Sequence, residues 1–308
     1  MRQTDRRHLV FLAVSLNLIC WTAVYSQNNR SAVSVTGSDM ATCTIPDPCR
    51  TFDTAISKTN SGGEIVVLSS GGYGPFNVTK SVAIISPGGI HAALAPTTGA
   101  AVTINGAGID VILRNLWINS LGASDGIKVL NAHQVNVENC TIARFSNGIN
   151  FIPNADCGLS VLDSFVRLNT TYGIYLSSGL GSVSRVTVDR TRLENNNEGI
   201  LVNPGSSGVV DSMIRESVIN SGGYGIDVLE TETSHTNVES CAVVHNTGFA
   251  LFGGGDATRV IRVSQSYIAN NAWGLISRNG DDLQSFGNNR LVGNYNGDGV
   301  FTSTRALK

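Results

Sequence analysis

The segment Asn196-Asn197-Glu198-Gly199-Ile200 contains the dipeptide that organises this chain, a glycine followed by a large apolar residue. The dipeptide recurs seven more times at intervals of 22 to 26 residues. The full set is Gly126-Ile127, Gly148-Ile149, Gly173-Ile174, Gly199-Ile200, Gly225-Ile226, Gly248-Phe249, Gly274-Leu275 and Gly299-Val300. A period near 25 residues is too short for a pair of long helices and suits one coil of a β-solenoid. We therefore predict an all-β chain built from stacked coils.

Each repeat begins with apolar residues at every second position, as in Ile174 and Leu176. Such alternation is typical of short strands whose apolar side chains face an interior. We assign the same inward role to Phe249 and Leu251 in the sixth repeat. A second alternating stretch follows in every repeat, and its last copy contains Phe286, Asn289 and Leu291. The chain is predicted to bend once within this stretch, at the same place in every coil.

A column of small residues lies at the predicted bend, where a tight inner corner admits only short side chains. Its members are Cys140, Ser164, Thr191, Ser217, Cys241, Ser266 and Asn289. Cys140 and Cys241 stand four coils apart, roughly 19 Å at about 4.8 Å per coil, far beyond the ~7 Å Cα separation that a disulfide allows. We predict that both thiols are free and buried. A second column, of Asn169, Asn196, Asn246 and Asn271, is predicted to form a stacked amide ladder.

The two ends of the solenoid differ in sequence. Between Arg50 and Lys58, apolar residues fall at helical spacing, which predicts a short amphipathic helix that covers the first coil. No helical pattern follows Phe301, so the last coil is predicted to expose a strand edge.

The composition excludes several classes of protein. The chain has 308 residues, a formal net charge of -2 and 14% charged residues, whereas soluble domains average roughly 25%. A chain so poor in basic charge is not expected to bind nucleic acid or to adhere to an anionic membrane surface.

The N-terminus is typical of an export signal. Arg2, Arg6 and Arg7 precede an apolar run from Leu9 to Val24, which is shorter than the ~20 residues of a membrane-spanning helix. We predict a signal peptide over residues 1–26 and a secreted or periplasmic protein without stable membrane insertion after its removal. The remaining chain divides into a leader with the capping helix (27–63) and the β-helix domain (64–308).

Export permits disulfides, and Cys43 and Cys49 close a short loop near the predicted mature start. We predict that these two residues pair. No Cys-x-x-Cys pair or cluster of histidines indicates zinc. Neither a metal nor a cofactor is predicted.

These repeats resemble the right-handed parallel β-helix proteins of the pectin lyase-like superfamily. The segment Asn196-Asn197-Glu198-Gly199-Ile200 is similar to the repeat of that group's general β-helix domain, and the resemblance extends over roughly residues 64–301. Residues 43–68 resemble the leader of a class of exported bacterial β-helix repeat proteins. The resemblance implies the fold. It leaves the activity open, because the superfamily includes polysaccharide lyases, hydrolases, esterases and epimerases beside noncatalytic members, and their complete catalytic motifs have no match here.

Enzymes of this superfamily place charged groups on the outer face of one long sheet. The residues predicted to face outward on the strands after each glycine include Ala250 and Phe252 in the sixth repeat. The polar members, Lys128, Tyr175, Asn203, Asp227 and Arg278, are our candidate ligand-binding residues, and Asp227 and Tyr175, roughly 10 Å apart over two coils, are weak catalytic candidates. An apolar stripe on the same face indicates a covering loop, ligand or subunit, so self-association is a further hypothesis. The stripe consists of Leu130, Ile152, Leu201, Leu229, Phe252 and Ile276.

Regular coils, few outward carboxylates and unmatched catalytic motifs favour a secreted noncatalytic module for binding or structural contact, with a polysaccharide or a cell surface as its partner. The alternative is a diverged polysaccharide lyase or glycoside hydrolase that acts on an extended glycan. Whether the protein is an enzyme stays open at this point.

Overall fold

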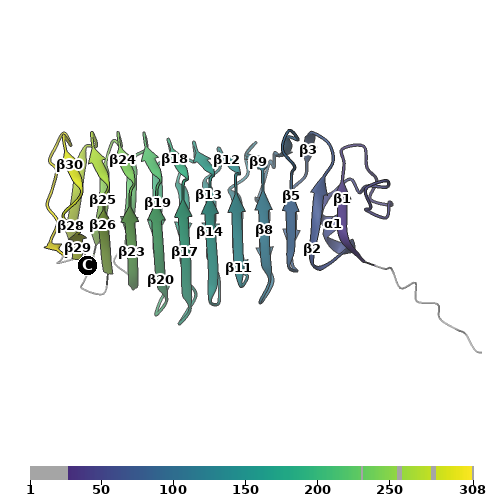
Figure 1. The fold of residues 1–308 in the computed structure, drawn as a ribbon, viewed down its shortest axis with the longest axis horizontal. Helices are drawn as coiled ribbons and strands as arrows, with labels where there is room; N and C mark the ends of the chain where they lie inside the picture. Colours follow the sequence, from purple (N-terminus) through teal and green to yellow (C-terminus); the bar gives the residue numbers. More distant parts are fainter. Residues whose placement is uncertain (1–26, 230–231, 255–258, 279–281, 307–308) are drawn as a thin grey trace, which may run out of the picture.

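The computed structural model describes residues 27–229, 232–254, 259–278 and 282–306, so the predicted signal peptide lies outside the described residues. The described chain is a parallel β-solenoid whose coils stack along one axis, with the N-terminal end and α1 (Phe52–Lys58) at one end (Figure 1). The predicted fold class is confirmed. Three sheets, here called A, B and C, run along the solenoid, and each full coil contributes one strand to each sheet.

The strands of each sheet follow one another in chain order along the axis. Sheet A consists of β1 (Asn28–Val33), β2 (Thr59–Val67), β5 (Val82–Ile85), β8 (Asp110–Arg114), β11 (Gln134–Glu138), β14 (Cys157–Leu162), β17 (Val183–Asp189), β20 (Val209–Arg215), β23 (Thr233–Glu239), β26 (Arg259–Ser264), β29 (Asp282–Ser285) and β31 (Ser303–Thr304). Sheet B consists of β3 (Gly71–Tyr73), β6 (Ala92–Leu94), β9 (Leu116–Asn119), β12 (Thr141–Ala143), β15 (Phe165–Arg167), β18 (Arg192–Glu194), β21 (Val218–Asn220), β24 (Ala242–Val244), β27 (Tyr267–Ala269) and β30 (Arg290–Val292). Sheet C consists of β4 (Phe76–Val78), β7 (Ala100–Asn105), β10 (Asp125–Asn131), β13 (Asn147–Phe151), β16 (Tyr172–Leu176), β19 (Glu198–Val202), β22 (Tyr224–Val228), β25 (Phe249–Gly254) and β28 (Trp273–Arg278).

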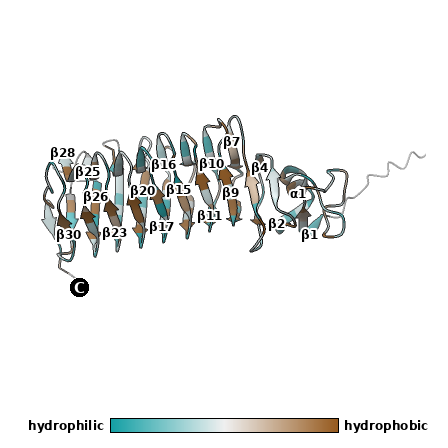
Figure 2. Ribbon diagram, turned by 90° about the horizontal axis from the view of Figure 1, so that it is seen from above, coloured by the Kyte–Doolittle hydropathy of each residue, from teal (hydrophilic) through white to brown (hydrophobic). Residues whose placement is uncertain are grey.

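The core is a set of apolar columns that run along the axis. Ile174, Ile200 and Ile226 pair in register on consecutive strands of sheet C, and all three are fully buried. Hydrophobic residues recur in the same way on the strands of successive coils (Figure 2). A single coil buries too little apolar surface alone, so the stack is the unit of stability.

The predicted bend separates sheet A from sheet B. A residue with positive φ stands immediately before six of the seven members of the small column, as Asn139 (φ 49) stands before Cys140. The residues with positive φ at this bend are Asn115, Asn139, Asp163, Arg190, Glu216, Ser240 and Gln265. The left-handed conformation is costly for residues other than glycine, so these turns require compensation from neighbouring coils.

The small column supplies part of that compensation through hydrogen bonds. The Thr191 amide donates to the Ser217 hydroxyl of the next coil at 3.2 Å, and the Cys241 amide donates to the Ser266 hydroxyl at 3.2 Å. Cys140 and Cys241 are free and buried, as predicted. Burial raises the pKa of the Cys140 thiol to about 12 and that of Cys241 to about 11. Both thiols are therefore kept in the neutral form.

The asparagine ladder forms at the second bend, between sheets B and C. The Asn169 Nδ2 donates to Asn196 Oδ1 at 2.8 Å, and the Asn246 Nδ2 donates to Asn271 Oδ1 at 2.9 Å. The second run continues to Asn294, which accepts from the Asn271 Nδ2 at 2.9 Å. All five amides are buried.

The predicted capping helix is α1. The Thr51 side chain caps its N-terminus by accepting from the Thr54 amide at 3.3 Å. The buried Phe52 ring packs on Tyr73 and Phe76 of the first coil, with ring centroids 5.3 and 4.7 Å away. The structure places Cys43 and Cys49 in a disulfide before this helix, with Cα atoms 4.6 Å apart.

The predicted register was wrong in the sixth repeat. Ile226 pairs with Leu251, so Phe249 lies on the outer face, where it stacks on Tyr224 with ring centroids 4.4 Å apart. Ala250, predicted to face outward, is fully buried. Gly248 has a different role from the other repeat glycines, because a Cβ there would collide with the Tyr224 ring.

The last coil also departs from the prediction. Val263 pairs with Ser285 instead of Phe286. Trp273 bridges Gly297, so Gly299-Val300 does not continue the inward column, and Val300 is exposed. The repeat period is therefore lost in the segment that pairs with β26 and β28.

Candidate functional site

The outer face of sheet C consists of rows of side chains that run along the solenoid axis. One row contains a predicted outward residue from each of seven consecutive coils, and it reads Lys128, Asn150, Tyr175, Leu201, Asp227, Phe252 and Ile276. A neighbouring row, at the start of the same strands, reads Asp125, Asn147, Tyr172, Glu198 and Tyr224. Groups from many coils therefore lie side by side on one surface.

The structure brings some of the predicted site residues together. The Asn203 Nδ2 donates to the Tyr175 hydroxyl at 3.0 Å, and Asp227 lies two coils from Tyr175 with Leu201 between them. Lys128 lies two coils beyond Tyr175, four coils from Asp227. The Arg278 guanidinium lies over the Phe252 ring, 5.4 Å from its centroid.

Glu198 is a site residue that the sequence analysis missed. It pairs with Tyr172 on one side and Tyr224 on the other, so two tyrosines flank this carboxylate in its row. The alternation that predicts outward side chains begins after each glycine, whereas Glu198 stands immediately before Gly199. The polar or aromatic residue two positions before each inward isoleucine was the signal that would have found it.

Burial perturbs the ionisation of both carboxyl groups. Asp227 is only 9% exposed, and its burial, followed by the charge of Glu198, raises its pKa to about 7. Burial also raises the pKa of Glu198. The Asp227 Oδ1 and Glu198 Oε2 atoms are buried without a hydrogen-bond partner. Both carboxyl groups therefore keep a proton to higher pH than a solvated carboxyl group does, because water does not fully solvate their charged forms.

Aromatic rings surround the two carboxyl groups. The Tyr172 and Tyr175 ring centroids are 5.3 Å apart, and those of Phe249 and Phe252 are 4.9 Å apart. Burial, followed by the Glu198 charge, raises the pKa of Tyr172. We call the set Tyr172, Tyr175, Glu198, Tyr224, Asp227, Phe249 and Phe252 the sheet C cluster.

The predicted apolar stripe is only partly open to solvent. Leu201 is buried, and the remaining members are half-buried by their neighbours in the stack. Of its members, Leu201 lies between Tyr175 and Asp227 in the row of the sheet C cluster.

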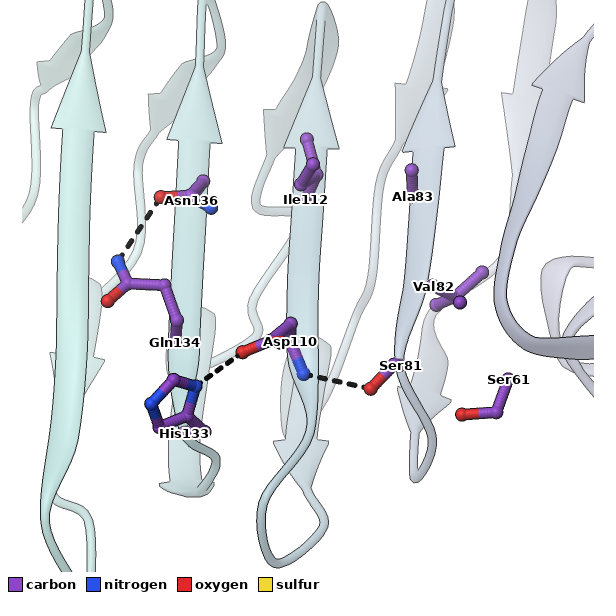
Figure 3. A pocket seen from close by; sticks show the side chains of 10 residues that line it. Ser61, Ser81, Val82, Ala83, Asp110, Ile112, His133, Gln134 and Asn136 are labelled. Carbon is purple, nitrogen blue, oxygen red and sulfur yellow. Dashed lines mark hydrogen bonds and ion pairs between the residues drawn. The ribbon is translucent and has the colours of Figure 1, made fainter.

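A second surface is an open groove of about 690 Å³ on the outer face of sheet A. Figure 3 shows its lining side chains on four neighbouring coils, with His133 turned toward Asp110. The His133 Nδ1 and Asp110 Oδ1 atoms are 2.7 Å apart, and the two side chains are 73% and 62% exposed. Because water solvates this pair, the groove offers no desolvated charge comparable with that of the sheet C cluster.

Among the described residues, no group of three or more His, Cys, Asp or Glu side chains is arranged to hold a metal ion. The described part of the chain likewise contains no helix with the length and hydropathy needed to cross a membrane.

Comparison with solved structures identifies the architecture. The chain is similar to pectate lyase Pel9A, with a TM-score of 0.65 and 12% identity over 86% of this chain and 81% of that one. The chain therefore shares the parallel β-solenoid fold of this lyase. A rhamnogalacturonan lyase has the same fold, with a TM-score of 0.52 and 12% identity over 82% of this chain and 84% of that one. Comparisons with protein-family models and with curated proteins found no match.

Proposed function

We propose that the outer face of sheet C binds an extended polysaccharide, and that the protein is an exported, noncatalytic glycan-binding module. The observation that carries the proposal is the sheet C cluster, in which aromatic rings and hydrogen-bonding groups from consecutive coils form continuous rows. Aromatic faces pack on the apolar faces of sugar rings, and amide and carboxyl groups bind hydroxyls. Two proteins with the same fold are named as lyases of pectate and rhamnogalacturonan, which supports a polysaccharide ligand.

A glycoside hydrolase is the second candidate, favoured by the Glu198 and Asp227 pair. Most glycosidases use two carboxyl groups, one of which is a general acid with a raised pKa. However, the complete catalytic motifs of the superfamily's enzymes have no match in this sequence, and the Asp227 Oδ1 atom has no hydrogen-bond partner to orient it. Binding therefore fits the geometry better than catalysis.

Binding and turnover are tested together by titration calorimetry against a glycan panel and by viscosity of the same glycans. We expect binding without a fall in viscosity, and at least tenfold weaker binding by Tyr175→Ala, because a tenfold loss corresponds to about 1.4 kcal/mol, the scale of one aromatic contact. Phe165→Ala, which removes a 41% exposed aromatic ring from sheet B, is the matched control.

Equal losses in Tyr175→Ala and Phe165→Ala would place the glycan elsewhere. Turnover that disappears in Asp227→Asn would establish the hydrolase in place of the binding module. Export is tested by N-terminal sequencing of the secreted protein, which is expected to begin at Gln27.

A further inference from the structure

The carboxyl groups of the sheet C cluster differ from several of those on sheet A in having no ion-pair partner. On sheet A, Glu138 pairs with Arg114 at 2.6 Å, and Asp189 pairs with Arg215 at 2.8 Å. None of the ion pairs among the described residues involves Glu198 or Asp227. Some outer carboxylates of sheet A are therefore neutralised by an arginine, whereas Glu198 and Asp227 have no ion-pair partner among the described residues.

Asp125, on the same face of sheet C, is a buried carboxylate that has hydrogen-bond donors. It is as buried as Asp227, and its Oδ1 accepts from the Asn147 and Asn150 side chains at 2.8 and 2.9 Å. Asp227 stands between Leu201 and Phe252, which donate nothing, and its Oδ1 has no partner. A buried carboxylate without donors is unfavourable, so the pair is suited to a ligand that brings its own donors.

The surroundings of the pair favour a cationic donor. Tyr172 and Tyr224 flank Glu198 on the two adjacent coils, and Phe252 flanks Asp227. Aromatic faces attract cations, and a desolvated site of rings and carboxylates recognises ammonium groups. An ammonium brings three N–H donors as well as the missing charge. Arg278 belongs to a strand two coils from that of Asp227, and its guanidinium lies over the Phe252 ring.

We infer that the sheet C cluster binds the ammonium group of an amino sugar, so that its ligand is a glycan with free hexosamine amines. The inference rests on the proposed function, since it names the ligand class of the same face. Rows that continue over many coils fit a repeating chain of sugars, and two adjacent carboxylates disfavour a polyuronate.

The test is titration calorimetry at pH 7 and low salt with three probes, the glucosamine hexamer, the N-acetylglucosamine hexamer and pentalysine. We expect the glucosamine hexamer to bind at least tenfold more tightly than the other two. Asp227→Asn and Glu198→Gln, which preserve side-chain shape, should each weaken that binding at least tenfold. Glu239→Gln, an outward carboxyl group on sheet A, should leave it unchanged. Circular dichroism of each variant checks the fold.

The alternative outcomes separate the inference from the proposed function. Equal binding of the two hexamers, or binding of only neutral or uronic glycans from the panel, would overturn the amino-sugar inference and leave glycan binding standing. Pentalysine that binds as tightly as the glucosamine hexamer would overturn it too, by showing charge attraction without sugar recognition. Failure of every glycan to bind would refute the proposed function and the inference together.

Discussion

The Asp227 carboxyl group links the stability of the protein to pH. Burial raises its pKa from 3.8 to about 7, so between about pH 4 and pH 7 the folded protein keeps a proton that the unfolded chain releases. The free energy of unfolding therefore falls as pH rises through this window, by at most about 4 kcal/mol for a shift near 3 units. Asp227→Asn removes the ionisation. We expect the variant to melt at a higher temperature than the parent at pH 8 and at nearly the same temperature at pH 4.

Asp163→Asn is a matched control, because the stability that Asp163 contributes depends on pH with the opposite sign. Its hydrogen bond from Arg190 lowers the pKa of the Asp163 carboxyl, so this group contributes stability above its ordinary pKa and loses it as pH falls. Because Asp163 is exposed, the effect should be small. Parallel melting curves for Asp227→Asn and the parent from pH 4 to pH 8 would contradict the assignment of a buried, uncompensated carboxyl group.

Single residues were predictable where strand alternation decides which way they point. Asp227 and Tyr175 lie outward because Ile226 and Ile174 lie inward. The partners that perturb Asp227 were not predictable in this way. The charge of Glu198, on the adjacent coil, raises the pKa of Asp227. Glu198 stands immediately before the glycine, where the backbone departs from strict alternation, so a period of two does not predict which way its side chain points.

At the scale of the elements, the turns are stabilised by contacts between coils. Asn271 donates to the Val243 carbonyl and the Asn294 side chain at 2.9 Å each, and it accepts from Asn246. Asn271→Ala removes these bonds and leaves buried groups of three coils unpaired. We expect it to lower the free energy of unfolding by about 3 kcal/mol, given about 1–3 kcal/mol for each buried group left unsatisfied. Asn197→Ala, an exposed residue outside the ladder, should cost less than about 0.5 kcal/mol in the same denaturant titration.

Equal effects of these two substitutions would show that the ladder is incidental to stability. The four predicted asparagines were recognisable because each stands two to four residues before the next repeat glycine. Gly222 interrupts the ladder between Asn196 and Asn246, since a Cβ there would collide with the Asn196 carbonyl oxygen. The columns of positive φ were not predictable, because residues as different as Arg190 and Ser240 adopt that conformation and only stacking imposes it.

For the whole molecule, the repeat period was enough to predict a stack of coils, and it failed where the repeat itself varies. In the sixth repeat Ala250 takes the place of the inward glycine, while Gly248 makes room for the Tyr224 ring. Because a glycine can serve either purpose, the repeat pattern alone placed Gly248, in place of Ala250, at the inward position. The bend between sheets A and B was predicted, but the residues after it were not assigned to a separate sheet, because strands of sheet B, such as β18 and β21, are only three residues long.

The two ends of the stack should open at different rates. At the N-terminal end, Phe52 of α1 packs on the first coil and its side chain is buried. At the C-terminal end, Val292 and Val300 are exposed and β31 has only two residues. Because each coil is stabilised chiefly by its neighbours, we expect hydrogen exchange followed by mass spectrometry to show fast exchange in β30 and β31, slow exchange in β1 and β2, and the slowest exchange in central strands such as β16 and β19. Equal protection along the stack would mean that the solenoid opens as one unit, and faster exchange of β1 than of β31 would show that α1 does not protect its end.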